Sequence, residues 1–330
     1  MGDCIDMVVS PQRCRPGAVW TRAVMTDDLE LQRVAALLNH VFEHPDPLTT
    51  ESLRWYYDEN PAGSAAVGRV EEDGKRLGNY ALIPNRFRST SGEERVLGLG
   101  VDLAVDPDAR GSGAFRRTVE DSYDRGVAQG FDGILGVANA NSAPRMVATL
   151  GWRSLAPLPV TMIPAIGRTT GFNSTTITDS TVGVVDGLVD GEFVRASRTG
   201  FAPVWTPELL RWRLRRPGHS YSIHVSDDLV VVSTRTHVSK VPFGIILGVL
   251  QRRSSAPVPG GRVAAVVGQH HKAPFVIHWG RSPALRMRGI PLPQKLMPSP
   301  LSLVLHSFVS DFNRDAFELG EFGFLDFDAY

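Results

Sequence analysis

Cysteine is almost absent from this chain of 330 residues, which holds only Cys4 and Cys14. Both lie in the first 17 residues, which we interpret as an N-terminal tail. The scarcity excludes a disulfide framework for the body of the chain and is consistent with a reducing compartment. We therefore expect a cytoplasmic protein.

Long hydrophobic runs are also missing. The longest apolar run, Phe243 to Leu250, is far shorter than the roughly 20 residues that a membrane helix requires, and its pattern indicates a buried strand. The N-terminal segment lacks the charged start and the long apolar core of a signal peptide. We expect neither a membrane span nor a membrane partner.

The sequence has no excess charge of either sign, because 35 Lys and Arg residues balance 35 Asp and Glu residues. Domains that bind DNA or RNA usually carry a basic surface, so nucleic acid is not an expected partner. His, Cys, Asp and Glu do not cluster at the spacing of metal ligands, and no metal is expected. The composition indicates a folded soluble protein, and the length favours about two domains.

The sequence does contain alternating strand and helix patterns. Between residues 18 and 167 the predicted order is strand, helix, helix, three strands, helix, strand, helix and strand. The helix at 115–129 shows the pattern most clearly, since its apolar residues recur every four positions. This order predicts an α/β (α+β) fold with a twisted mixed sheet flanked by helices.

The chain divides into four predicted parts: the tail at 1–17, a first domain at 18–167, a linker at 168–192 and a second domain at 193–330. The linker is predicted from its richness in Thr, Ser, Gly and Asp and its lack of helical periodicity.

The two domains are predicted to be tandem copies of one architecture. Glu208 and Trp212 in the second half match Glu51 and Trp55 in the first, in two similar helices. A repeated domain explains this match, and a chance likeness between two helices is the alternative.

A glycine-rich turn joins a predicted strand to a helix in "LAVDPDARGSGAF", residues 103–115. The first amides of a helix lack intrahelical partners and carry partial positive charge, so a diphosphate can dock there if no side chain obstructs it. Small residues at 111–114 leave this approach open, and Arg110 could pair with a phosphate. Neither the dinucleotide fingerprint nor the Walker loop fits the spacing. A plain turn with a helix cap is the alternative.

This stretch resembles the signature of the GNAT superfamily of acyl-CoA dependent N-acyltransferases. The later segment "ANANSAPRMVATLGW" resembles the second signature of that superfamily, and together the similarities cover residues 18 to about 160. The resemblance implies that acetyl-CoA or another acyl-CoA is bound and that its acyl group passes directly to a primary amine between two diverging strands. The residues that would hold the coenzyme are Leu103, Ala104, Val105, Arg110, Gly111, Ser112, Gly113, Ala114, Phe115, Asn141 and Ser142.

The usual acid and base of the superfamily are missing. Leu99 stands where many relatives have a Glu, and Met146 and Val147 stand where many have a Tyr. Asp102, on the strand before the glycine loop, is one candidate base. His270 and Asp328 are the other catalytic candidates, although the end of a helix explains His270 better.

The second domain has no matching glycine loop, so we expect one acyl-CoA per chain and an acceptor pocket completed by that domain. More weakly, the chain resembles tandem-GNAT enzymes that acylate nucleotide-linked amino sugars for cell-surface glycans. An aminoglycoside, a polyamine or a protein amine is the alternative acceptor, and a non-catalytic acyl-CoA sensor is the alternative function. The candidate acceptor-binding residues are Trp55, Tyr56, Arg86 and Asp326, of which Trp55 could equally be a core anchor.

Overall fold

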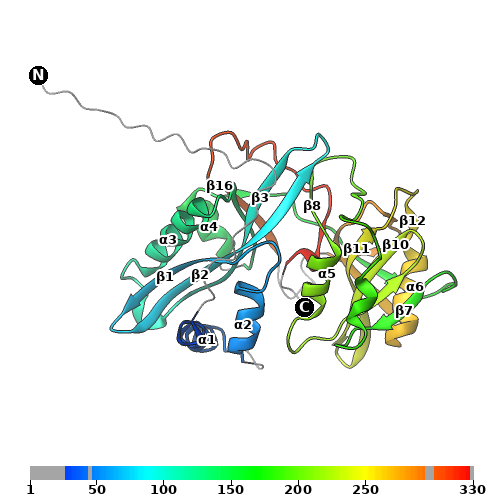
Figure 1. Ribbon diagram of the computed structural model, residues 1–330, viewed down its shortest axis with the longest axis horizontal. Coiled ribbons are helices and arrows are strands. Elements are labelled where there is room, and N and C mark those ends of the chain that lie inside the picture. Colours follow the sequence, from blue (N-terminus) through cyan, green and yellow to red (C-terminus); the bar gives the residue numbers. More distant parts are fainter. Residues whose placement is uncertain (1–26, 44–46, 141, 294–300, 328–330) are drawn as a thin grey trace, which may run out of the picture.

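The protein is described here by a computed structural model, which covers residues 27–43, 47–140, 142–293 and 301–327. Two mixed sheets lie side by side along the long axis, each flanked by helices (Figure 1). This arrangement confirms the predicted fold class. No helix in these ranges is long and apolar enough to cross a bilayer.

The first sheet follows the predicted order of elements closely. Its strands run in the order β1 (Ala66–Glu72), β2 (Lys75–Ser89), β3 (Glu94–Val105), β4 (Gly133–Ala138), β16 (Ser302–Ser307) and β5 (Arg153–Ser154), and β8 (Phe201–Pro203) pairs with β2. The helices α1 (Asp28–Phe42) and α2 (Thr50–Tyr57) contribute to the main core, whereas α3 (Ala114–Ala128) and α4 (Ser142–Leu150) pack in a second cluster. The predicted strand at 18–25 lies outside the described residues.

The second sheet repeats this plan. Its strands run in the order β15 (Ile290–Pro291), β6 (Val160–Pro164), β13 (Phe275–Arg281), β11 (Val241–Gln251), β10 (Leu229–Val238), β9 (Ser222–Val225) and β7 (Asn173–Thr176). In both halves three antiparallel strands lead through a helix, α3 or α6 (Gly260–His271), to a parallel fourth strand. The repeat predicted from the sequence is therefore present in the topology.

Each sheet contains a strand that is contributed by the other half of the chain. β16 lies between β4 and β5 in the first sheet, while β6 pairs with β13 in the second sheet. Residues 168–192, expected as a linker, contain β7 and a short 3-10 helix, η2 (Val182–Val185). β7 pairs with β9 at the edge of the second sheet, and this pairing satisfies its backbone hydrogen-bonding groups. The domain boundaries at 18–167 and 193–330 remain a prediction from the sequence.

The two similar helices, α2 and α5 (Pro207–Leu214), meet through a pair of tryptophans. Trp55 Nε1 donates to the carbonyl of Trp212 over 2.9 Å, and Trp212 Nε1 donates back to the carbonyl of Trp55 over 3.0 Å. Their rings stack with centroids 4.7 Å apart. The N-caps Thr49 and Thr206 also match. The repeated sequence therefore forms a nearly symmetrical contact between the halves.

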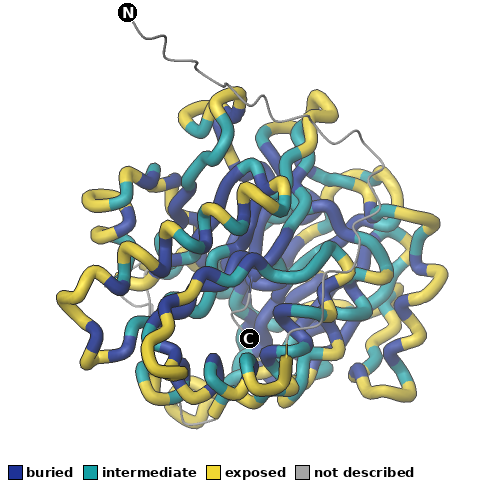
Figure 2. Tube along the Cα trace, turned by 60° about the vertical axis from the view of Figure 1, so that its left-hand side comes forward, coloured by how far each residue is buried: buried dark blue, intermediate teal, exposed yellow. Residues whose placement is uncertain are grey.

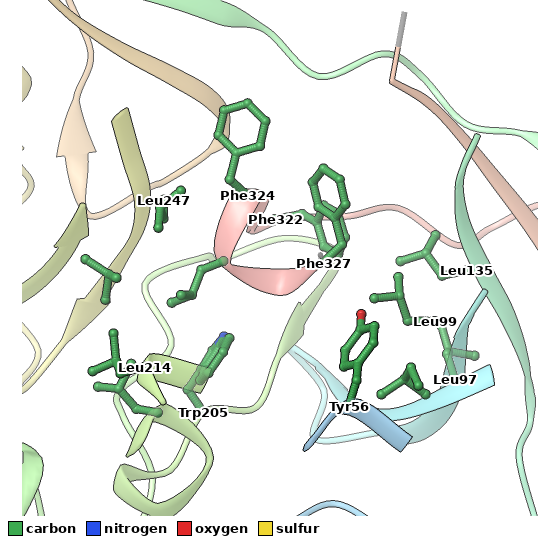
Figure 3. Packing of buried hydrophobic residues seen from close by; sticks show 14 of the residues in the cluster. Tyr56, Leu97, Leu99, Leu135, Trp205, Leu214, Leu247, Phe322, Phe324 and Phe327 are labelled. Carbon is green, nitrogen blue, oxygen red and sulfur yellow. The ribbon is translucent and has the colours of Figure 1, made fainter. Parts of the chain in front are cut away.

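One hydrophobic core runs through both halves. Buried segments pass through the centre of the molecule and exposed ones lie at its margin (Figure 2). The C-terminal aromatic segment fills the space between the sheets, with η4 (Phe324–Asp326) at its centre. In Figure 3, Phe324 and Phe327 lie between Leu247 of the second sheet and Leu99 of the first. The aromatics in the C-terminal segment thus join the two halves.

Candidate functional site

Strands β3 and β4 separate part of the way along their length. Their parallel register ends at the pair Gly100 and Gly136, whereas β3 continues to Val105. A β-bulge between β2 and β3 sets Asp102 and Leu103 opposite Tyr80 alone. Because bulges bend and twist a strand, the bulge accounts for the divergence. Divergence of these two strands is what the sequence resemblance implied.

A cavity of about 280 Å³ opens where the two strands diverge. Five elements contribute to its wall, together with the loop after β4 and the segment after η4. The lining residues are Phe42, Tyr80, Leu99, Gly100, Val101, Asp102, Leu103, Gly136, Val137, Ala138, Asn139, Ser142, Met146 and Phe327.

The glycine loop leaves the end of β3 and opens into α3. Gly111 and Gly113 have φ of 84° and 83°, which side chains rarely adopt, and a Cβ at either position would meet nothing within 4 Å. The helix has no side-chain cap and no acidic residue in its first turn. Ala109 and Ala114 anchor the loop in a small buried cluster. The first amides of α3 are therefore not covered by a side-chain cap.

Asp102 is held in an unusual backbone conformation beside the cavity. Its φ is 55°, at the bulge, so the alternation of side chains along β3 is broken there. Tyr57 donates its hydroxyl to Asp102 Oδ2 over 2.8 Å, and Asn79 Nδ2 donates to the Asp102 carbonyl over 3.2 Å. Burial and the adjacent carboxylate raise the pKa of Tyr57 well above its usual value. These contacts orient the Asp102 carboxylate.

The other expected coenzyme residues lie close to the same place. Leu103 and Ser142 line the cavity, and the backbones of Ala104 and Val105 pair with β2 on one side only. Asn141 lies outside the described residues, as does Asp328. Asn139, which sequence reasoning did not select, lines the cavity and accepts from Ser142 N over 3.0 Å at the start of α4.

The expected acceptor residues Trp55 and Tyr56 are in the core instead. Their exposed fractions are 4% and 6%, and the rings of Trp55, Tyr56 and Trp212 pack against one another with centroids 4.7–6.2 Å apart. A sugar would find no free indole face there. Tyr56 and Asp326 line a second, much smaller cavity of about 30 Å³, which shares Leu99 with the first.

Asp326 is half-buried and has structural partners. Its carboxylate accepts from Trp205 Nε1 over 2.8 Å and from the amide of Gly323 over 2.7 Å. Burial raises its pKa to about 6. The carboxylate therefore fixes the turn that carries Phe327 into the first cavity, in place of the sugar contact expected from the sequence.

Arg86 and His270 are not brought to the cavity. Arg86 forms ion pairs with Glu94 and Glu192 near the end of β2. His270 lies at the end of α6, which Figure 1 shows at the opposite end of the molecule from α3 and α4. Its Nε2 lies 2.9 Å from Ser222 Oγ. The interpretation as part of a helix end fits His270, and the role as a base does not.

The imidazole of His270 packs against those of His224 and His271. The burial of this group predicts that the protein loses stability in acid. Burial lowers the pKa of His224 to about 3 and that of His271 to about 4, below the value near 6.5 of an unfolded chain. The unfolded state therefore binds more protons, and stability falls as pH drops from 6.5 towards 4, by about 1.4 kcal/mol per pH unit for each group. The raised pKa values of Glu321, about 7, and Asp326, about 6, oppose this trend, whereas burial of His278, whose pKa falls to about 4, adds to it.

Urea unfolding at pH 7.0 and pH 5.0 measures this loss. We expect a lower free energy of unfolding at pH 5.0, and an equal or higher value would contradict the burial of these neutral imidazoles.

No group of His, Cys, Asp and Glu side chains in the part of the chain that the structure describes is arranged to bind a metal.

The second half lacks an open glycine loop at the matching position. Before α6 the chain forms β12 (Val258–Pro259), which pairs with β14 (Leu285–Arg286). A Cβ at Gly260 would lie 3.1 Å from Met287 Sδ, so this turn is packed against its neighbours. The sequence correctly indicated that the loop is not repeated.

Comparisons with solved structures show a fold similar to that of N-acetyltransferases. A probable N-acyltransferase from Enterococcus faecalis has a TM-score of 0.57 at 13% identity, over 86% of this chain and 71% of that one. A GCN5-related N-acetyltransferase from Anabaena variabilis has a TM-score of 0.53 at 11% identity, over 86% and 72%. Eis1 from Mycobacterium abscessus has a TM-score of 0.50 at 12% identity, over 88% and 71%.

Sequence comparisons add no closer relative. No family model matches the sequence, and no curated protein matches it significantly. At 11–13% identity the structural likeness establishes the fold. The chemistry of the site has to be argued from its own residues.

Proposed function

We propose that this protein is an N-acyltransferase that transfers the acyl group of acyl-CoA, most simply acetyl-CoA, to a primary amine. One observation carries the proposal: a cavity opens between the diverging strands β3 and β4, and β3 leads directly into an uncovered glycine loop at the start of α3. A diphosphate fits the loop, and an extended thioester arm fits the gap between the strands.

Different segments of the chain would bind different parts of acyl-CoA. Amides of the loop from Gly111 to Phe115 would hold the pyrophosphate, with Arg110 exposed nearby. The amide of Ser112 also donates to the Ala109 carbonyl over 3.3 Å. Among the described residues, no strand pairs with the β4 side of β3 from Leu103 to Val105, and this edge would pair with the pantetheine arm. Ser142 would lie near the sulfur, because it lines the cavity at the start of α4.

Asp102 would accept the proton of the attacking amine. Its carboxylate is oriented by Tyr57 and lies in the wall of the cavity, which no other carboxylate of the described residues lines. Acyl-CoA supplies the activated carbonyl when bound, and the amine attacks that carbon directly. The amine nitrogen would form the new amide bond as the carbon–sulfur bond breaks and would pass its proton to Asp102, which returns it to solvent. CoA would leave as the thiolate with the electron pair of the broken bond and take a proton from solvent.

The acceptor is assigned here as a small primary amine. A nucleotide-linked amino sugar remains the prediction from sequence, and it gains no support from Trp55, Tyr56 or Arg86, whose side chains are engaged elsewhere. The assay is thiol release from acetyl-CoA with a panel of nucleotide-linked amino sugars, aminoglycosides, polyamines and peptides with free amino groups. Release that depends on one class identifies the acceptor. CoA binding without turnover on every class would favour the acyl-CoA sensor.

Gly113→Asp tests the loop. The substitution places a carboxylate where the diphosphate would lie, and Asp tolerates positive φ better than most residues. We expect CoA affinity, measured by calorimetry, to fall at least about 10-fold, equivalent to about 1.4 kcal/mol. Gly92→Asp is the matched control, since Gly92 has φ of 84° and open space around it in the turn between β2 and β3. Equal affinity of both variants would refute the loop assignment.

A further inference from the structure

Two cavities meet at a wall made by Leu99 and Phe327. Both side chains line the first cavity, of about 280 Å³, and also the second, of about 30 Å³. No other described residue lines both cavities. Leu99 comes from β3 and Phe327 from the segment after η4 (Figure 3). Because these two side chains lie between the cavities, we call them the partition.

The partition lies at the end of the first cavity that is remote from the glycine loop along β3. Of the β3 residues that line this cavity, Leu103 is nearest to the loop in sequence and Leu99 is farthest from it. Under the proposed function the pyrophosphate lies at the loop and the pantetheine arm lies along Leu103 to Val105. The thioester would therefore lie near Gly100, and the acyl group would extend from it towards the partition.

Phe327 is held in place by contacts on several sides. Its ring packs against those of Trp279 and Phe324, with centroids 5.2 Å and 6.0 Å apart. Its carbonyl accepts from Arg213 Nη2 over 2.8 Å. Phe327 is 9% exposed and Leu99 is 5% exposed. Because packed interiors resist displacement, the partition is a fixed wall of the first cavity.

The second cavity, behind the partition, presents mainly apolar and aromatic side chains. Its polar lining residues are Asn60, Asn85, Arg213 and Asp326. Asn60, Arg213 and Asp326 form hydrogen bonds with other parts of the protein. An alkyl chain suits this surface better than a charged amine, because a buried charge needs a partner of its own.

We infer that Leu99 and Phe327 determine which acyl groups the protein accepts. The partition ends the acyl site, so acetyl and similarly short acyl groups fit in the first cavity. A longer alkyl chain is excluded, because it would have to pass into the second cavity through these two side chains. This inference deepens the proposed function and rests on it.

The test compares wild-type protein with Phe327→Ala on acetyl-CoA and on hexanoyl-CoA, whose acyl chain is longer. In wild-type protein, kcat/KM for hexanoyl transfer to the best amine of the panel should be at least about 10-fold below that for acetyl transfer. Large-to-small substitutions in a core leave apolar space that can take an apolar ligand. The ratio of hexanoyl to acetyl transfer should therefore rise at least about 10-fold in Phe327→Ala. Calorimetry with both acyl-CoAs should show the same change in preference without turnover.

Phe324→Ala is the matched control. Phe324 is 6% exposed and packs on Trp279 with ring centroids 5.2 Å apart, as Phe327 does, but it lines neither cavity. This variant should lose stability in a similar way, measured as the thermal midpoint, and keep the wild-type ratio. Leu99→Ala opens the partition from β3 and should also raise the ratio. It decides the question if Phe327→Ala does not fold.

The outcomes separate the two proposals. The inference about the partition is overturned if wild-type protein transfers hexanoyl as well as acetyl groups, or if the folded partition variants keep the wild-type ratio. A change in amine preference alone would also overturn it, since the partition would then face the acceptor. Acyl transfer by the wild-type protein would still stand in each case. If the wild-type protein binds neither CoA nor acetyl-CoA, the proposed function fails, and the inference fails with it.

Discussion

Asp102→Asn is expected to lower kcat/KM for acyl transfer by about 100-fold or more, within the range that general bases contribute. Asn has nearly the same size as Asp, tolerates the φ of 55°, and can still accept the hydrogen bond from Tyr57. It cannot take the amine proton. The acyl-CoA site is unchanged, so CoA affinity measured by calorimetry should stay within about 2-fold of wild type.

The control for this variant is Asp73→Asn. Asp73 also has a positive φ, of 50°, and it lies exposed in the turn between β1 and β2. It should keep full activity, because no cavity residue is near it in the first sheet. If Asp102→Asn and Asp73→Asn were equally active, the proton acceptor would have to be another group, and the carboxylate at the bulge would have only a structural role.

Trp55→Ala is expected to reduce the free energy of unfolding by about 3–5 kcal/mol, the usual effect of removing a large buried aromatic side chain. The change removes the stack with Trp212 and the donor to the Trp212 carbonyl, and both contacts join α2 to α5. Urea unfolding at pH 7 measures it. A loss below about 1 kcal/mol would mean that this contact contributes little to joining the halves.

A double-mutant cycle isolates the contact between the tryptophans. Trp55→Phe and Trp212→Phe each remove one indole donor, and we expect a coupling energy of at least about 0.5 kcal/mol between them. Trp55→Phe combined with Trp152→Phe serves as the control pair. Trp152 packs in the separate cluster beside Tyr123, so this pair should be additive within about 0.5 kcal/mol.

Much of the first half could be predicted from local signals. The helical period of α3, the turn at residues 73–74 and the glycines at 111 and 113 each depend on neighbours in sequence, and all three appear as expected. The repeat of Trp55 at Trp212 also indicated the two-fold plan. Periodicity, capping and turn chemistry are readable in a single sequence because their causes are local.

The rest of the site depends on contacts between distant segments. The bulge that holds Asp102 beside the cavity arises from the pairing of β2 with β3. Strand alternation alone could not settle the direction of Asp102. The sequence suggested that Trp55 could stack on a sugar. Its stacking partner in the structure, Trp212, is 157 residues away and could not be recognised from local sequence.

The exchange of strands makes the two halves dependent on each other. A fragment ending at residue 167 would lack β16 (Ser302–Ser307) and would leave the edge of β4 exposed. Unpaired edges recruit other chains, so such a fragment is expected to aggregate when expressed alone. During synthesis, β4 gains this partner only after almost the whole chain has been made, because β16 ends at Ser307.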